Sequence, residues 1–264
     1  MRKISFTKMS GAGNDFVLIE APKKKFSRSW PAVARTLCAR SKSIGADGLL
    51  VVWRRGPRLE YYNADGSRAF CGNGSRCAAW WMFTRGWIRQ DFRLRSSQGA
   101  IIGRVIGKEQ VRIRMPSPSN IRLGLALKAL GRVYRAAAID TGVPHAVVAV
   151  RSLDDFPVVD VGRALRNHRA FAPKGANVNF VSVGPDSVRL RTYERGVEDE
   201  TLACGTGAAA AALIANAWSK RASPVRIVAR GGVLLVRFQR FKNGALGDVW
   251  LEGPAQIIFE GEVR

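Results

Sequence analysis

Two short runs of the chain share a pattern that could move protons. One reads Cys71-Gly72-Asn73-Gly74 and the other reads Cys204-Gly205-Thr206-Gly207, about half the chain apart. Each places a thiol directly before two glycines that flank one polar residue, and a helix-forming run follows each. A thiolate can accept a proton and a thiol can donate one. Two thiols on opposite sides of one carbon atom could therefore remove its proton and return another on the opposite face.

The glycines of these turns favour the binding of an anion. Glycine allows positive φ and a close approach of the backbone to a ligand. At the start of a helix, such a turn leaves backbone N–H groups bare, and a carboxylate is a natural guest there. We expect both turns to donate to the carboxylate of one substrate, with the thiols of Cys71 and Cys204 on the two sides of its α-carbon.

The start of a helix does not by itself make these thiols good bases. A cysteine pKa of about 8.5 can fall to about 3.5–7.5 at a helix N-terminus. The helix dipole supplies only ~0.3–1 kcal/mol, less than one pKa unit, and burial acts in the opposite direction. N–H donation to sulfur or a nearby base must supply the rest. We expect the pair to titrate as one unit, with one thiolate and one thiol as the working state.

The other cysteines, Cys38 and Cys77, are expected in the core. An even number of cysteines could form disulfides, but the chain is long and its first residues lack a secretion signal. A zinc site is the other alternative. Cys71 and Cys77 lack CxxC spacing, and neither His145 nor His168 is near a cysteine in the sequence, so no metal is expected.

The composition predicts a cytoplasmic globular protein with no membrane segment. Hydrophobic residues make up 47% of the chain and charged residues 24%, and no apolar run approaches the ~20 residues of a membrane span. The net charge of +23 raises the alternative of a nucleic-acid partner. However, apart from the run 23–25, basic residues are scattered and many alternate with apolar ones, as on exposed strand faces. We expect no specific nucleic-acid partner.

Hydrophobic periodicity predicts a repeated arrangement of strands around one apolar helix. In the first half we expect helices at 29–40, capped by Ser29, and at 74–83; strands are expected at 4–9, 16–19, 49–53, 59–62 and in three segments from 92 to 115. In the second half we expect further strands between the run Pro116–Ser119 and a short helix at 161–167. After that helix we expect strands at 178–183 and 188–193, a helix at 207–218, and strands at 225–229, 233–238 and 248–251.

The run Pro116–Ser119 is the best linker and divides the predicted domains, 1–118 with Cys71 and 119–264 with Cys204. A return of about the last ten residues to the first domain is the alternative for the chain end. Because the run 208–218 is apolar all round, its helix should be buried, and we expect each sheet to wrap around its central helix.

Several motifs together resemble the diaminopimelate epimerase family. The runs 8–16 and 63–77 are similar to the N-terminal signatures of that family, and the runs 193–196 and 200–207 are similar to its second signature. Gly142–His145 and Asn177–Phe180 fit two further blocks in the right order. The similarity covers nearly the whole chain.

The resemblance implies an α+β fold of two pseudo-symmetric domains, each a mostly antiparallel sheet around a central helix, with the site in the cleft between them. It implies an isomerase that interconverts LL- and meso-diaminopimelate without pyridoxal phosphate or another cofactor, in lysine and peptidoglycan biosynthesis. Its partner would be a small amino-acid substrate, and a homodimer follows by analogy.

Carried over to this sequence, the resemblance assigns three kinds of role. Cys71 and Cys204 would be the acid/base pair, assisted by His145 and Glu194. The reacting carboxylate would be held by Gly72-Asn73 and Gly205-Thr206. The distal end of the substrate would be bound by Asn14, Asn63, Asn177, Glu194 and Arg195. On residue type alone, each asparagine is as readily explained by turn formation and His145 by a place in the core.

Two positions depart from the family pattern and keep alternatives open. Val143 stands where many members have asparagine, and Gly48 stands where some have glutamine. A lost amide at 143 removes one hydrogen bond to the substrate, and such bonds discriminate strongly. One alternative is therefore a racemase of another amino acid, such as histidine, on the same scaffold. The other is a basic nucleic-acid-binding protein without catalysis.

Overall fold

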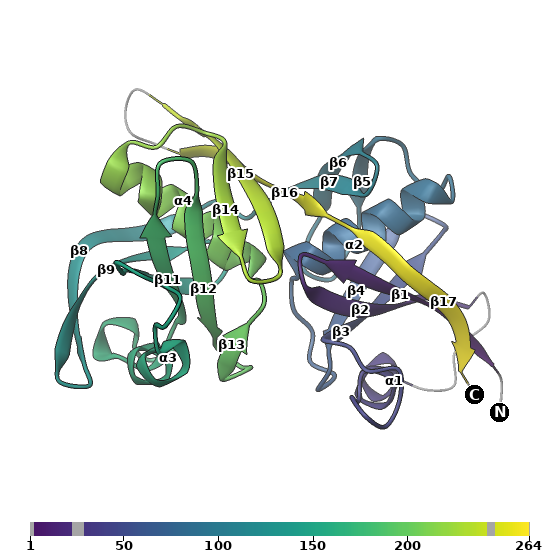
Figure 1. The fold of residues 1–264 in the computed structure, drawn as a ribbon. Helices are drawn as coiled ribbons and strands as arrows, with labels where there is room; N and C mark the ends of the chain where they lie inside the picture. Colours follow the sequence, from purple (N-terminus) through teal and green to yellow (C-terminus); the bar gives the residue numbers. More distant parts are fainter. Residues whose placement is uncertain (1–2, 23–28, 242–245, 264) are drawn as a thin grey trace. The chain divides into compact units, whose positions relative to one another are not determined.

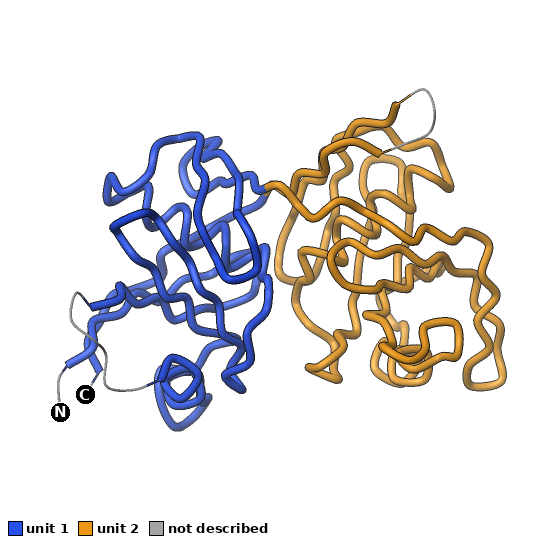
Figure 2. The backbone as a smooth tube through the Cα atoms, turned by 180° about the vertical axis from the view of Figure 1, so that it is seen from behind, with its two compact units in different colours: residues 1–113, 253–264 blue, residues 114–252 orange. Residues whose placement is uncertain are grey.

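The chain folds into two compact units. The computed structural model describes residues 3–22, 29–241 and 246–263, so the basic run 23–25 lies outside the described residues. Residues 1–113 and 253–264 form unit 1, and residues 114–252 form unit 2 (Figure 2). The division follows residue 113, where the sequence indicated one after 118. The chain end belongs to unit 1 because its last strand pairs with the first.

The main sheet of unit 1 has the strand order β17-β1-β2-β3-β4 (Figure 1). The strands β2 and β3 are parallel and the other neighbours are antiparallel. A two-residue loop with φ of 56° at Ala12 and 90° at Gly13 joins β1 to β2, which is the geometry of a type I′ hairpin. The strands are β1 (Ile4–Gly11), β2 (Asn14–Glu20), β3 (Gly48–Trp53), β4 (Arg58–Asn63) and β17 (Gln256–Val263).

Two helices of unit 1 pack against this sheet. The helix α2 (Gly72–Thr84) contacts β1, β2, β3, β4 and β17, and most of its residues are buried. The helix α1 (Trp30–Leu37) packs on β3 and β4. After α2 come three antiparallel strands: β5 (Asp91–Leu94), β6 (Ile101–Gly107) and β7 (Gln110–Arg114).

The first helix is shorter than the sequence suggested. We expected residues 29–40, but α1 ends at Leu37 and Cys38 is its C-cap. The chain turns back there, since Gly45 N–H donates to Leu37 O over 3.0 Å. Ser29 is the N-cap residue, yet its side chain makes no capping hydrogen bond. The predicted core position of Cys38 is confirmed, with 2% of its surface exposed.

Unit 2 repeats the order of elements found in unit 1. The succession β9-β10-α3-β11-β12-α4 corresponds to β1-β2-α1-β3-β4-α2, and the inner pair β10/β11 is again parallel. The elements are β8 (Ser119–Ala129), β9 (Arg132–Asp140), β10 (Pro144–Ala149), α3 (Val158–Arg166), the 3-10 helix η1 (Arg169–Phe171), β11 (Asn177–Val183), β12 (Val188–Glu194), β13 (Asp199–Thr201) and α4 (Gly205–Ser219). They are followed by β14 (Val225–Ala229), β15 (Gly232–Arg240) and β16 (Leu246–Pro254). The predicted duplication is therefore present in the topology.

The central helix of unit 2 is enclosed by strands. The helix α4 contacts β9, β10, β11, β12, β14 and β15, and the alanines of its run Ala208–Ala212 are fully buried (Figure 1). This confirms the expectation from its all-round apolar sequence. The α+β class, with mostly antiparallel sheets around one helix in each unit, is confirmed as well.

The described residues contain neither a membrane-spanning helix nor a cluster of metal ligands. No helix among them is long and apolar enough to cross a membrane. Within the same ranges, no group of three or more His, Cys, Asp or Glu side chains is arranged to hold a metal ion.

Candidate active site

Cys71 is the N-cap residue of α2. Its backbone is extended, with φ −127° and ψ 109°, and the chain becomes helical at Gly72. The N–H of Gly74 donates to Cys71 Sγ over 3.4 Å. The thiol thus takes the position that a Ser or Asp oxygen holds in an ordinary capped helix. N–H donation to this sulfur stabilises its anionic form.

Cys204 has the same place on α4. Its φ of −120° and ψ of 114° nearly repeat those of Cys71, and Gly207 N–H donates to its Sγ over 3.4 Å. The hydroxyl of Thr206 lies 3.4 Å from the same sulfur. N–H donation to sulfur is one of the two additions to the helix dipole that the sequence called for, the other being a nearby base, and both turns supply this donation. Cys71 is half-buried, whereas only 6% of Cys204 is exposed.

Asn73 and Asn14 are joined directly in unit 1. Asn73 Nδ2 donates to Asn14 Oδ1 over 2.5 Å, and Asn14 Nδ2 donates to Asp47 Oδ2 over 3.0 Å. On its other side, Asn73 Oδ1 accepts from Arg76 Nη2 over 2.9 Å. Two residues predicted to bind substrate are therefore held in a hydrogen-bonded chain between a cation and a carboxylate. Each amide nitrogen still has a second hydrogen to donate.

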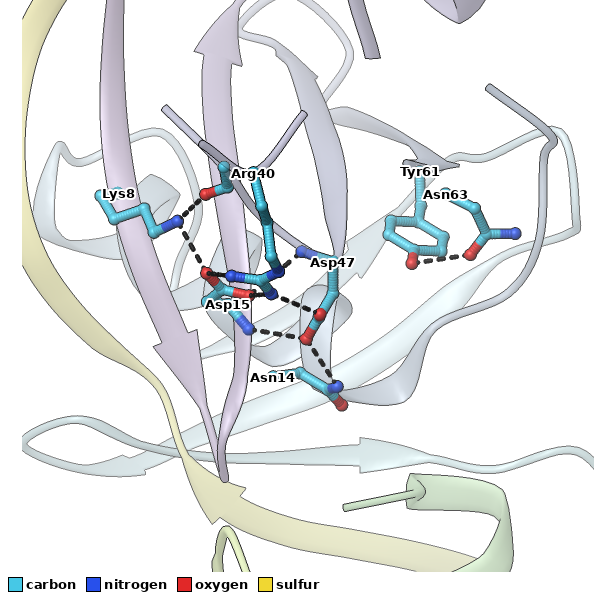
Figure 3. A network of polar contacts seen from close by, with 8 residues as sticks. Lys8, Asn14, Asp15, Arg40, Asp47, Tyr61 and Asn63 are labelled. Carbon is cyan, nitrogen blue, oxygen red and sulfur yellow. Dashed lines mark hydrogen bonds and ion pairs between the residues drawn. The ribbon is translucent and has the colours of Figure 1, made fainter. Parts of the chain in front are cut away.

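A compact ion network supports the Asp47 end of that chain (Figure 3). Arg40 Nη2 lies 2.8 Å from Asp47 Oδ1 and 2.7 Å from Asp15 Oδ1, and Lys8 Nζ lies 2.7 Å from Asp15 Oδ2. Burial raises the pKa of Asp15, but hydrogen bonds from Arg40 and Lys8 outweigh it and hold the pKa below its usual value. Asp15 therefore stays ionised at neutral pH, and the network fixes the start of β2, where Asn14 lies.

Asn63 is held by its own turn. Its Oδ1 accepts from Tyr61 Oη over 2.8 Å, as Figure 3 shows, and its Nδ2 donates to Ser67 Oγ over 2.9 Å. Tyr61 also explains the glycine at position 48. A Cβ on Gly48 would lie 2.4 Å from the Tyr61 ring, so the ring occupies the space that a glutamine would need. The phenol hydroxyl brings a polar group to this place instead.

The predicted distal-binding residues of unit 2 lie around the end of β12. Asn177 Oδ1 accepts from the Arg195 backbone N–H over 2.8 Å, and the Arg195 side chain donates to Lys174 O over 3.0 Å. Glu194 Oε2 accepts from Thr201 Oγ1 over 2.8 Å. An acid and a cation are thus neighbours here, both half-buried. Such a pair suits an ammonium and a carboxylate.

His145 is buried in unit 2, with 1% of its surface exposed. Burial, and beyond it the positive charge of Arg195, lowers the pKa of His145 to about 3. The imidazole is therefore neutral at pH 7. Its Nδ1 lies 3.0 Å from Asn179 Nδ2, while its Nε2 is buried with no hydrogen-bond partner among the described residues. His145 is thus poor as a base and retains one unused polar nitrogen.

Three residues that support the site were not predicted from the sequence: Asp47, Arg76 and Asn179. The sequence context of each one could have indicated it. Asp47 directly precedes the apolar strand β3, Arg76 interrupts an apolar helix, and Asn179 lies between two apolar residues of a buried strand. A polar residue inside an apolar run must be hydrogen-bonded when buried. The partner itself cannot be read from the run.

Comparison with known proteins identifies the family. A sequence model of the family described as diaminopimelate epimerase matches residues 6–119 and 137–257. The diaminopimelate epimerase of Chlorobaculum tepidum is 40% identical over 265 residues, covering 97% of this chain and 99% of that protein. The diaminopimelate epimerase of Aquifex aeolicus is 37% identical over 279 residues, covering 98% of both chains.

Solved structures with the same fold are more distant in sequence. A phenazine biosynthesis protein of the PhzF family from Bacillus anthracis has a TM-score of 0.79 at 12% identity and covers 100% of both chains. A hydroxyproline epimerase from Agrobacterium vitis, solved with trans-4-hydroxy-L-proline, has a TM-score of 0.70 at 16% identity and covers 100% of this chain and 91% of that one. These two support the fold alone. From the family match and the full-length identity to its members, the chain belongs to the diaminopimelate epimerase family.

Proposed function

We propose that the protein epimerises LL-diaminopimelate to meso-diaminopimelate without a cofactor, with Cys71 and Cys204 as the acid/base pair. The observation that carries this is the matched geometry of the two thiols. Each caps a central helix and accepts an N–H over 3.4 Å. A reaction that inverts one carbon in both directions needs two proton carriers, and the two thiols have the same backbone placement for that role.

In the proposed reaction, one cysteine enters as thiolate and the other as thiol. The thiolate removes the α-proton, and the electron pair left on carbon is delocalised into the adjacent carboxylate. Bare N–H groups at the starts of α2 and α4 would stabilise that charge as it develops. The second thiol then gives its proton to the opposite face. After one turnover the proton has moved from one sulfur to the other, so the reverse reaction uses the same pair.

Selection of the substrate would depend on its distal end. Diaminopimelate carries a second ammonium and carboxylate, and Glu194 with Arg195 offers one complementary charge for each. Asn14, Asn63 and Asn177 would add amide contacts. The valine at 143 has no amide to offer, while Tyr61 places a hydroxyl beside Asn63 in unit 1. If the protein were a racemase of another amino acid, such as histidine, its substrate would lack the second ammonium and carboxylate that Glu194 and Arg195 fit.

The test is isotope exchange in D₂O with reduced protein, LL-diaminopimelate and no pyridoxal phosphate. We expect deuterium at one α-carbon and formation of the meso isomer. Cys71→Ala and Cys204→Ala should each abolish epimerisation, while Cys77→Ala, which changes a buried residue of the same helix, should retain it. Absence of exchange in the reduced wild type would contradict the function. Full activity in either alanine variant would contradict the pairing.

We further infer a cytoplasmic homodimer, by analogy with the family, and no specific nucleic-acid partner. Light scattering after size exclusion should give twice the chain mass of 28.9 kDa. A salt-dependent shift with generic DNA, together with no turnover, would favour the basic binding protein instead.

A further inference from the structure

Asn179 lies at the centre of a buried polar cluster in unit 2. It is fully buried on β11, and Thr192 beside it on β12 is 2% exposed. Its Nδ2 is 3.0 Å from Ala146 O and 3.0 Å from His145 Nδ1, and its Oδ1 accepts from Thr192 Oγ1 over 3.0 Å. The cluster adjoins the Cys204 turn, because a Cβ on Gly207 would lie 2.3 Å from Asn179 Oδ1.

The orientation of the Asn179 amide follows from these contacts. A backbone carbonyl oxygen only accepts, so the group that faces Ala146 O must be the NH₂. The same NH₂ faces His145 Nδ1 and donates to it. Nδ1 therefore carries no proton, and in the neutral imidazole the proton is on Nε2. That Nε2–H is buried without a partner among the described residues.

We propose that Asn179 is a positioning residue that fixes the Nε2–H tautomer of His145, so that His145 donates a hydrogen bond to a substrate carboxylate and does not act as a base. The donation from His145 to a substrate carboxylate rests on the proposed function, whereas the assignment of the tautomer does not. The role differs from the assistance to the thiols that the family resemblance implied.

The surroundings of His145 fit an anionic acceptor. The charge of Arg195 disfavours the imidazolium form, and the same charge attracts a carboxylate. His145 also lines a pocket of about 470 Å³ in unit 2, whose charged lining residues are the basic Arg122 and Lys174 and the acidic Asp140. A buried N–H without a partner lowers stability because it has lost its hydrogen bond to water. A bound carboxylate would satisfy it.

The first experiment is ¹⁵N NMR of the histidine side chains in the wild-type protein at pH 7. The chain has only two histidines, and His168 serves as the reference signal. We expect the long-range ¹H–¹⁵N pattern of a single Nε2–H tautomer for His145, unchanged from pH 5 to pH 8. A proton on Nδ1, or a titration within that range, would overturn the proposal whether or not the protein is active.

Variants separate positioning from structural support. Asn179→Leu removes the donor to Nδ1 and should give a mixture of tautomers, with kcat/KM lowered about tenfold or more, as for one lost hydrogen bond to a charged group. Thr192→Val is the matched control: it alters the same cluster without touching His145, and the tautomer should persist. A unique Nε2–H tautomer in Asn179→Leu would contradict the role of Asn179.

The donor role is tested by replacement of the imidazole. His145→Gln keeps an N–H near the position of Nε2 but cannot act as a base, whereas His145→Leu keeps neither property. We expect kcat/KM of the Gln variant to exceed that of the Leu variant about tenfold. Equal activities would overturn the donor role. If the wild type lacks epimerase activity while the tautomer is as expected, the proposed function fails and the positioning by Asn179 stands.

Discussion

The Arg76 guanidinium donates to the side chain of Asn73, with Nη2 and Oδ1 2.9 Å apart. Arg76 is fully buried, its Nε donates to Pro254 O, and no ion pair of Arg76 is found among the described residues.

Burial lowers the pKa of Arg76 to about 10, and the charges of the Cys77 and Cys71 sulfurs act against that shift. Burial raises the pKa of Cys77 to about 12, so Cys77 is a neutral thiol at pH 7. In α4 the position five residues after the cysteine is Ala209, so the two turns match in backbone but not in charge.

Arg76→Met should make Cys71 harder to ionise. The pH at which Cys71 is half-alkylated by iodoacetamide is expected to rise by about one unit, because a nearby cation favours a thiolate by at least this amount. Mass spectrometry of the labelled peptides gives the midpoint. Cys204 in the same sample is the internal control and should not change. Equal shifts at both cysteines would indicate general loosening instead.

The third residue of each central helix is a glycine, Gly74 in α2 and Gly207 in α4, and the two glycines have different neighbours. Gly207→Ala places a Cβ 2.3 Å from Asn179 Oδ1, whereas Gly74→Ala places one 2.9 Å from the end of the Leu50 side chain. The leucine can move and the hydrogen-bonded amide cannot. We expect Gly207→Ala to lower the free energy of unfolding by about 1–3 kcal/mol and Gly74→Ala to lower it less. Urea denaturation measures both, and the reverse order would contradict the model of a fixed Asn179.

Asp47→Ala should weaken substrate binding through Asn14. The substitution leaves Asn14 Nδ2 and the Asp15 N–H without their acceptor, at a cost of about 1–3 kcal/mol. A less ordered Asn14 should raise KM more than it lowers kcat. Glu262→Ala, which breaks an exposed ion pair with Lys3, is the control and should change stability by less than about 1 kcal/mol. An unchanged KM in Asp47→Ala would show that Asn14 does not depend on this carboxylate.

Stability should fall in acid partly because of His145. Its pKa is about 6.5 in the unfolded chain and about 3 in the folded protein. Between these values the unfolded state binds a proton that the folded state does not, so the free energy of unfolding falls as the pH is lowered from 6.5 towards 3. Urea midpoints at pH 7 and pH 4.5 should differ less in His145→Gln than in the wild type. Equal differences would mean that His145 titrates alike in both states.

Local sequence patterns determined much of the fold and pointed to the reacting groups that we propose. The apolar helices, the turns at Cys71 and Cys204, and the buried places of Cys38 and Cys77 follow from composition and spacing, because helix periodicity and glycine turns depend on neighbours in the chain. The expected first residues of the two central helices, 74 and 207, lie within two residues of the observed starts at Gly72 and Gly205. The end of α1 was misplaced, since a contact from Gly45, outside the periodic run, sets it. The start of α3 was misplaced as well, because this helix begins at Val158 and not at 161.

The partners of the polar side chains were decided by tertiary structure. Asp47 holds Asn14 from 33 residues away, and Asn179 meets His145 from 34 residues away. Strand pairing brings such residues together, and a register shift of one residue would turn them to opposite faces. The sequence therefore determined which atoms could carry a proton. The paired strands decided which of those atoms are held, which stay neutral, and where a buried N–H is left for a ligand.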